Sequence, residues 1–306
     1  MPDGSAVSAV WPRKPDREPN EAAPPAAGEQ ARRNLLLRVV AALVLAPTTI
    51  ALAYAGGWLW IALVTLASIG LYVEWLMIVG TAREMRVLVT GAVALAIVAI
   101  CLAAERVDAS LMAAVLGVAA VTLLSPKPRG WPAAGFAYAA AAEIASVLVR
   151  LDQVEGFLAL IFVLLIVWVT DIGGYFAGRG IGGPKLWPRV SPKKTWAGAV
   201  GGFAASLAVA AAFFAFDPHK SDSLLMLKME RLLLLAAALS VASQLGDLFE
   251  SAVKRHFNVK DSSHLIPGHG GLMDRLDGFV AAVVLAAIFG FLRGGPDGVG
   301  RGLMVW

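Results

Sequence analysis

Three aspartates toward the C-terminal end of the chain have the residue type and spacing to bind a metal ion. Asp274 and Asp277 stand three residues apart, which places both on one face of a helix, and Asp247 precedes them in an apolar segment. Carboxylates also cap helix starts, and this alternative alone would account for Asp274 and Asp277. Three carboxylates exceed what a cap needs, and hard oxygen ligands arranged around phosphates are typical of magnesium. The pattern therefore favours a Mg²⁺ site formed by Asp247, Asp274 and Asp277, and leaves a second cation open.

The apolar segment that contains Asp247 carries a stripe of polar residues. They recur at alternating steps of four and three residues, and they are Ser240, Gln244, Asp247, Ser251 and Lys254. This spacing puts them on one side of a helix, because a helix turns once in about 3.6 residues. In lipid, such a stripe must face protein or a water-filled cavity. The basic residues Arg255 and Lys260 follow it, and a glycine-rich turn from 267 to 271 comes next.

A second polar segment covers residues 171–198. Asp171 lies near the end of an apolar helix, where a carboxylate is costly and therefore usually functional. The glycines of this segment let backbone N–H groups approach a phosphate, and five cations accompany them: Arg179, Lys185, Arg189, Lys193 and Lys194. A cytosolic loop with orienting charges and packed glycines is an equally good interpretation of this segment alone. Gly198 and Gly202 form a GxxxG pattern, which is a weak signal in a glycine-rich membrane protein.

The composition excludes several classes of protein. Of the 306 residues, 58% are hydrophobic and 16% are charged, and the mean hydropathy is +0.71. A single soluble core does not hide so large an apolar excess, so a multi-pass membrane protein is indicated. A disulfide scaffold is excluded because Cys101 is the one cysteine. His256, His264 and His269 have no cysteine nearby and fit no common zinc spacing.

The elements that must position these residues are apolar helices. Segments of bilayer-spanning length predict an all-α, polytopic membrane protein with about nine transmembrane helices. They are 35–55, 57–79, 87–104, 107–124, 132–149, 156–177, 196–216, 231–252 and 278–293. Residues 1–34 are rich in proline and charge and predict a disordered cytoplasmic tail. We expect five spans in 35–150 and a catalytic region of four spans in 151–306, with motif loops at 171–198 and 251–277.

Basic residues predict the orientation of the chain. If the N-terminus is cytoplasmic and nine spans alternate, most of the 26 Lys and Arg residues fall on the cytoplasmic side, including both motif loops. The opposite side receives Arg106, Arg150, Lys220, Lys228, Arg231, Arg293 and Arg301. The net charge of +4 therefore reports orientation in the membrane, and no nucleic-acid partner is expected.

Residues 251–277 resemble the signature of the phosphatidate cytidylyltransferases, also called CDP-diacylglycerol synthases. Residues 171–195 resemble the second motif of this family, including the run from Ser191 through Lys193, Lys194 and Thr195. The family commonly has Glu after this run, whereas Ala197 stands here. The resemblance implies transfer of a cytidylyl group from CTP to phosphatidic acid, giving CDP-diacylglycerol and pyrophosphate for phospholipid biosynthesis. It also implies a divalent metal and a multi-pass protein of the cytoplasmic membrane with its active site on the cytoplasmic side.

This resemblance implies roles for residues of both motifs. The residues expected to act in the reaction are Asp247, Asp274, Lys254, Arg255 and Lys260. Those expected to bind substrate are Asp171, Ser191, Lys193, Lys194, Thr195, Ser251, His269, Gly270, Gly271 and Arg275. The nucleophile is a phosphate oxygen that is already ionised, so we expect positioning and charge neutralisation to dominate over general-base catalysis.

Three alternatives stay open at the level of sequence. CDP-alcohol phosphotransferases also use an Asp-x-x-Asp-Gly pattern, which 274–278 imitates, but the rest of their pattern is missing. Another lipid-directed CTP transferase or a lipid kinase would need similar residues. A transporter would also have many spans, although here the polar residues cluster at one face and not at the midplane. A homodimer is possible under each of these interpretations.

Overall fold

The computed structural model describes residues 43–215, 225–260, 262–263 and 270–305. Within them, eight helices are long and apolar enough to cross a membrane, and this confirms the all-α, polytopic fold class. Their bounds are α2 Gly57–Ile78, α3 Met85–Ala103, α4 Val107–Leu124, α5 Gly130–Leu151, α6 Gly156–Gly180, α7 Trp196–Ala215, α8 Leu225–His256 and α9 Met273–Gly294. A short helix, α10 (Val299–Met304), follows them.

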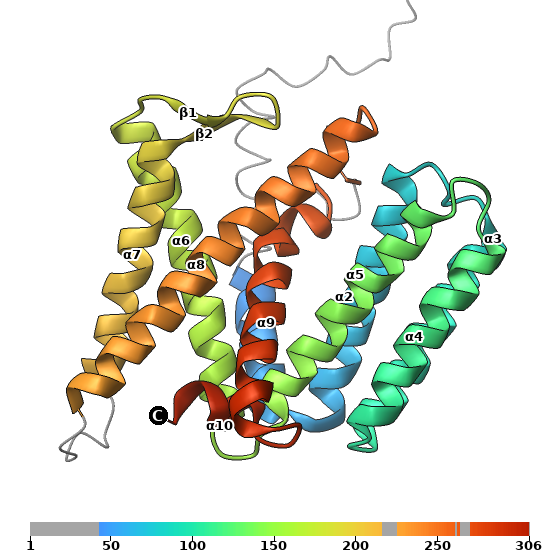
Figure 1. The fold of residues 1–306 in the computed structure, drawn as a ribbon, viewed down its shortest axis with the longest axis horizontal. Helices are drawn as coiled ribbons and strands as arrows, with labels where there is room; N and C mark the ends of the chain where they lie inside the picture. The colour runs from blue at the N-terminus through green and yellow to red at the C-terminus, as the bar shows by residue number, and fades with distance from the viewer. Residues whose placement is uncertain (1–42, 216–224, 261, 264–269, 306) are drawn as a thin grey trace, which may run out of the picture.

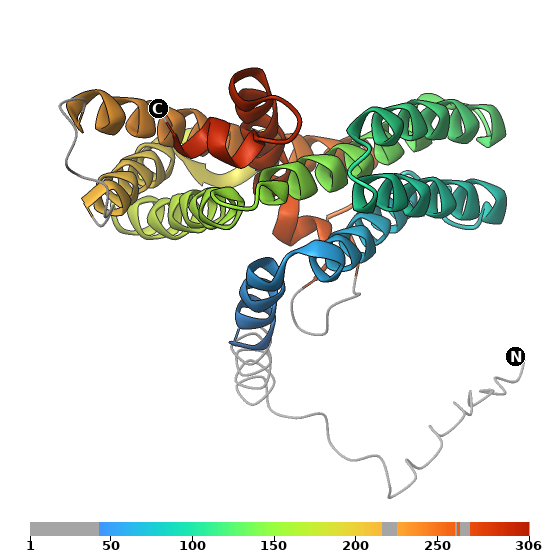
Figure 2. The same ribbon diagram turned by 90° about the horizontal axis from the view of Figure 1, so that it is seen from below.

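Eight of the nine predicted spans correspond to α2–α9. The first predicted span, 35–55, begins outside the described residues, and its described part is a shorter apolar helix, Leu43–Ala55. This helix projects from the rest of the bundle in Figure 2. The tail 1–34 lies outside the described residues, so the tail, the count of nine and the division at residue 150 stay predictions.

Helix α9 occupies the centre of the bundle (Figure 1). It contacts α2, α5, α6, α8 and α10. On one side of α9 lie α6, α7 and the tilted α8, and on the other side lie α2–α5. Large side chains such as Trp75, Phe136 and Phe162 are fully buried between these helices. The first turn of α9 is therefore held by helices from both halves of the chain.

The loops predicted to be cytoplasmic gather at one end of the bundle. In Figure 1 the end of α8, the start of α9 and a small hairpin lie at the upper end, and α10 and the C-terminus lie at the lower end. The hairpin pairs β1 (Lys185–Trp187) with β2 (Ser191–Thr195) in antiparallel register and connects α6 to α7. Thr195 caps the start of α7, because its Oγ1 accepts the N–H of Gly198 at 3.1 Å. Both motif segments thus meet at the same end.

The glycine pattern of α7 packs against α6. A Cβ on Gly202 would lie 2.4 Å from the carbonyl oxygen of Thr170, and a Cβ on Gly198 would lie 2.9 Å from that of Gly174. The two backbones therefore approach more closely than any larger residue permits. The GxxxG pattern that was a weak signal in the sequence is confirmed as a packing motif, and it fixes Asp171 of α6 beside the hairpin.

Alanine at Gly202 is expected to destabilise the protein by about 1–3 kcal/mol, because the added methyl group overpacks the α6–α7 contact. Alanine at Gly180 is the matched control, since nothing lies within 4 Å of a Cβ placed there. Thermal unfolding in detergent measures both variants. Equal midpoints for the two variants would contradict the close approach of α6 and α7.

Candidate active site

The polar stripe of α8 faces α9 through a network of ionisable side chains. The Nζ atom of Lys254 lies 2.5 Å from Oδ1 of Asp274 and 2.7 Å from Oε2 of Glu250. Glu250 is 1% exposed and Lys254 is 13% exposed, so this network is largely shielded from solvent. A single ammonium group between two carboxylates lowers the cost of burying them, and removing it would leave both without a cationic partner. Lys254 therefore joins α8 to the first turn of α9.

The second oxygen of Asp274 is held by backbone. Its Oδ2 accepts the N–H of Gly271 at 3.1 Å and that of Ser262 at 3.4 Å. Both of these N–H groups precede α9, whose N-cap is Leu272 and has no side-chain capping hydrogen bond. Asp274 therefore holds the segment before the helix, in addition to pairing with Lys254. These contacts fix the direction in which the carboxylate points.

Asp171, Asp247 and Asp277 come together from three different helices. Lys194 of β2 forms an ion pair with Asp247 of α8. Asp277 of α9 lies within electrostatic reach of both Asp171 and Asp247. Three carboxylates that face one another repel, so a cation among them stabilises the arrangement. Lys194 supplies one positive charge at this point.

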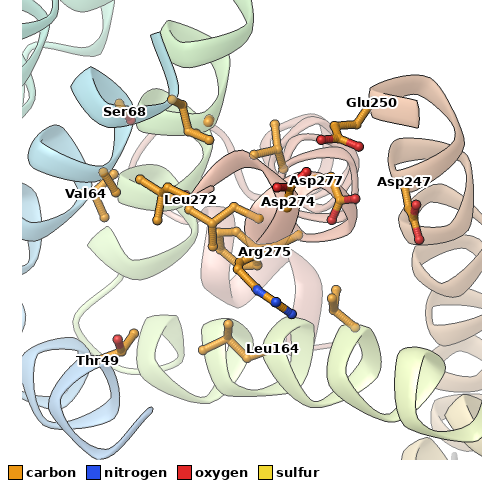
Figure 3. Close-up of a pocket in the computed structure, with 18 of the residues that line it drawn as sticks. Thr49, Val64, Ser68, Leu164, Asp247, Glu250, Leu272, Asp274, Arg275 and Asp277 are labelled. Carbon is orange, nitrogen blue, oxygen red and sulfur yellow. The ribbon is translucent and has the colours of Figure 1, made fainter. Parts of the chain in front are cut away.

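The first cavity, of about 730 Å³, is amphipathic. Its polar wall contains Asp171, Asp247, Glu250, Ser251, Lys254, Asp274, Arg275 and Asp277. Figure 3 shows the carboxylates of Asp247, Glu250, Asp274 and Asp277 gathered on one side, whereas Arg275 extends toward Leu164 of α6. The remaining wall is mainly apolar and comes from the helix Leu43–Ala55, α2, α5, α6 and α9. This cavity suits a molecule with an anionic head and an apolar body.

The second cavity, of about 550 Å³, lies between α6, the hairpin, α7 and α8. Its cations are Arg179, Lys193 and Lys194, and the glycines Gly174, Gly178 and Gly198 leave space in its wall. Asp171 and Asp247 line both cavities. The two cavities therefore adjoin at a pair of carboxylates, with a basic compartment on one side and a largely apolar one on the other.

The residue types at this junction are those that bind hard divalent cations in proteins. The oxygens of Asp247, Asp274 and Asp277 line one cavity, and carboxylate oxygens are the ligands that Mg²⁺ prefers. In the described part of the chain, no three His, Cys, Asp or Glu side chains already stand close enough to form a complete metal site. Lys194 and Lys254 instead neutralise the carboxylates at either end of the junction. The predicted magnesium ligands thus stay a prediction.

Most of the predicted substrate-binding residues line the two cavities. They are Asp171, Lys193, Lys194 and Thr195 in the second cavity and Ser251 and Arg275 in the first, with Asp171 shared. Ser191 pairs with Trp187 in the hairpin and lines neither cavity. Gly270 has φ of 82° and leads into the start of α9. His269 lies outside the described residues.

Three further residues predicted to act in the reaction or to bind substrate do not line either cavity. Arg255 and Lys260 are exposed and line neither cavity, and Nε of Arg255 donates to the carbonyl oxygen of Val190 at 3.4 Å. Arg255 thus contacts the hairpin. The N–H of Gly271, a residue expected to bind substrate, donates to Asp274.

Two carboxylates near the site, Glu250 and Glu74, were not predicted from the sequence. Glu250 belongs to the polar stripe by spacing, since it follows Asp247 by three residues and precedes Lys254 by four. Glu74 lies in an apolar span without any surrounding motif, yet it contacts the start of α9. The cost of a carboxylate within a membrane span, which singled out Asp171, is the signal that would have found Glu74.

The fold and the site define a multi-pass membrane protein with a charged active-site junction at one end of its bundle. Residues 36–292 match the Cytidylyltransferase family, and the chain belongs to this family of nucleotidyltransferases. A phosphatidate cytidylyltransferase of Brucella suis biovar 1 (strain 1330) is 38% identical over 269 residues, which cover 86% of this chain and 96% of the relative. The match favours a cytidylyltransferase over a transporter or a CDP-alcohol phosphotransferase.

Relatives from two other bacteria match a shorter part of the chain. The phosphatidate cytidylyltransferase of Haemophilus influenzae (strain ATCC 51907 / DSM 11121 / KW20 / Rd) is 43% identical over 142 residues, covering 46% of this chain and 48% of the relative. The enzyme of the same name from Bacillus subtilis (strain 168) is 44% identical over 131 residues, covering 43% and 46%. Similarity to proteins of this name therefore extends across several bacteria.

Proposed function

We propose that this enzyme transfers the cytidylyl group of CTP to phosphatidic acid, giving CDP-diacylglycerol and pyrophosphate. The observation that carries the proposal is the junction of a basic cavity and a largely apolar cavity at Asp171 and Asp247. A water-soluble nucleotide and a membrane lipid need two such compartments that meet where their phosphates react. The names of the relatives support the same reaction.

The amphipathic cavity is the proposed site for phosphatidic acid. The guanidinium of Arg275 extends into it, and an arginine can bind a phosphate with two parallel hydrogen bonds. Apolar side chains such as Leu45, Val64 and Leu164 would contact the acyl chains. Because the lining comes from membrane-spanning helices, the lipid would keep most of its apolar surface out of water while its head reacts.

The basic cavity is the proposed site for CTP. Arg179 and Lys193 line this cavity and not the first, whereas Lys194 reaches toward the shared carboxylates. These three cations would neutralise the triphosphate. The end of the bundle that carries both motif loops would face the cytoplasm, where CTP is found, and the excess of basic residues in these loops supports that orientation. A homodimer stays a prediction.

The reaction needs charge neutralisation more than a base. A phosphate oxygen of phosphatidic acid would attack the α-phosphorus of CTP and form the new P–O bond. The bond from the α-phosphorus to the bridging oxygen of the β-phosphate breaks, and pyrophosphate leaves with that electron pair. Lys194, Lys254 and Arg275 would bring the two anions together. Asp247 and Asp274, with Asp277, would hold Mg²⁺, which supplies charge stabilisation at the phosphates.

The two cavities predict separate effects on the two substrates. Replacing Arg275 with glutamine should raise the KM for phosphatidic acid at least about tenfold and leave that for CTP within about threefold, because a charge-assisted hydrogen bond contributes about 1.5–3 kcal/mol. Replacing Lys193 with glutamine should do the reverse. Steady-state kinetics in mixed micelles measure both constants for each variant. Both variants affecting the same substrate would contradict the assignment of the cavities.

The proposed reaction is tested by pyrophosphate release from detergent-purified protein. We expect release that requires CTP, phosphatidic acid and Mg²⁺ together and stops when any one is omitted. The variant Asp274→Asn, assayed alongside, should lose the release. Folded wild-type protein that releases no pyrophosphate from any nucleotide with any lipid phosphate would overturn the proposal.

A further inference from the structure

Glu74 is a fully buried carboxylate that joins the N-terminal half of the chain to the signature segment. It lies in α2 near the end that carries the active site, and it is 0% exposed. Its Oε1 accepts the N–H of Leu272 at 2.7 Å, and its Oε2 accepts the N–H of Met273 at 2.7 Å. A helix start leaves such N–H groups unpaired, and a negative charge beside them is stabilising. Glu74 therefore caps α9 from another helix.

The same carboxylate holds the segment that precedes α9. Ser263 Oγ donates to Oε1 of Glu74 at 2.6 Å, and Ser262 Oγ lies 2.9 Å from Oε2. Each oxygen of Glu74 thus accepts two hydrogen bonds, which uses the four acceptor positions of a carboxylate. Residues 262–263 and 272–273 are therefore tied to a single side chain that comes from almost 200 positions earlier in the sequence.

Ser262 connects Glu74 to the predicted active site. Its Oγ also lies 3.2 Å from Oδ2 of Asp274, so its one proton is shared between the two carboxylates. Packing at this point is tight: a Cβ on Gly271 would lie 1.7 Å from Ser262 Oγ and 2.7 Å from Oε2 of Glu74. Glycine is therefore required at 271 by these contacts.

We propose that Glu74 is a positioning residue, which fixes residues 262–263 and 272–273 and through them the Asp274 carboxylate. This inference rests on the function proposed above, because Asp274 is there assigned to the reaction. Glutamine in place of Glu74 would turn one pair of its four acceptor positions into donors, facing groups that themselves donate. The side chain keeps its size, so the substitution perturbs the anchoring of the signature segment with little change in volume.

The test compares Glu74→Gln with Glu143→Gln in detergent-purified protein. Glu143 is also fully buried, but it accepts a hydrogen bond from Thr65, about 13 Å farther along α2 from Glu74. We expect Glu74→Gln to lower kcat about 10- to 100-fold and to raise the Mg²⁺ concentration that gives half the maximal rate, as for other residues that orient a ligand carboxylate. The KM for CTP should stay within about threefold. Glu143→Gln should change none of these quantities.

Backbone hydrogen exchange supplies a readout that does not depend on turnover. In Glu74→Gln the amides of Leu272 and Met273 should exchange faster than in the wild type, and in Glu143→Gln they should not. A folded Glu74→Gln protein with wild-type kcat, Mg²⁺ requirement and exchange would overturn the proposal, as would an equal loss in Glu143→Gln. If Glu74→Gln does not fold, Ser263→Ala removes one of the four hydrogen bonds, and we expect kcat to fall about 3- to 10-fold. An unchanged kcat in that variant would overturn the proposal as well.

The two proposals fail in different ways. A wild-type protein that forms no CDP-diacylglycerol would refute the proposed reaction, whereas exchange at Leu272 and Met273 would still report whether Glu74 anchors α9. An active wild-type protein that is insensitive to Glu74→Gln would refute the positioning role alone.

Discussion

Replacing Asp247 with asparagine is expected to lower kcat about 1,000-fold, because the site loses a proposed Mg²⁺ ligand at the point where the two cavities meet. Asp247 lines both cavities and pairs with Lys194. Asparagine has nearly the same shape, so the packing of α8 is retained while the proposed Mg²⁺ ligand and the partner of Lys194 are lost. The rate of pyrophosphate release at saturating CTP, phosphatidic acid and Mg²⁺ measures the effect.

Asp108→Asn is the matched control for this substitution. Asp108 is an exposed residue in the first turn of α4, where it forms an ion pair with Arg106. We expect kcat of this variant to equal that of the wild type, because exposed pairs contribute little. If Asp247→Asn turned over at more than about a tenth of the wild-type rate, Asp247 would not have the role assigned to it.

Replacing Lys254 with methionine is expected to destabilise the fold by about 3–5 kcal/mol and to abolish turnover, because Glu250 and Asp274 lose the cation that lies between them. Methionine keeps an unbranched side chain of similar shape, with sulfur in place of Cδ, and lacks the ammonium group. Thermal unfolding in detergent and pyrophosphate release are the two measurements. An unchanged unfolding midpoint would show that the contacts of Lys254 do not compensate these carboxylates.

A second substitution separates stability from catalysis. Adding Glu250→Gln to Lys254→Met removes one of the two carboxyl groups left without that cation, so we expect much of the lost stability to return. Turnover should not return, because Lys254 is proposed to neutralise a phosphate as well as to hold Asp274. Recovery of activity together with stability would assign Lys254 a structural role alone.

The sequence predicted the helices well because apolar length is a direct signal of a membrane span. The predicted helix boundaries were wrong where charged residues extend a helix beyond its apolar part. Helix α8 begins at Leu225 and not at 231, although Lys228 and Glu230 lie in its first turns, and α9 begins at Met273 and not at 278. At α9 the contacts of Asp274 and Glu74 stabilise a helix start that hydropathy does not indicate. The hairpin was missed because its short strands, rich in lysine and proline, lack an alternating apolar pattern.

The site was predictable to the extent that its residues lie close in sequence. The stripe from Ser240 to Lys254 faces other helices as predicted, since Ser240 contacts Thr170 and Lys254 contacts Asp274. Glu74 was not found because its partners lie far along the chain and no local pattern links them. The sequence also does not indicate which cavity each cation lines. Lys193 lines one cavity and Arg275 the other only because of the tertiary fold, and no local pattern shows which substrate each would bind.

The most direct test of the proposed function follows the label of CTP into the lipid. CTP labelled at its α-phosphate or at its γ-phosphate is incubated with the purified protein, phosphatidic acid and Mg²⁺, and the lipids are then extracted. Cytidylyl transfer predicts that the α-label enters the lipid as CDP-diacylglycerol, while the γ-label stays in water as pyrophosphate. Entry of the γ-label into the lipid would instead identify a kinase. If neither label entered the lipid with a folded preparation, cytidylyl transfer to lipid would be contradicted.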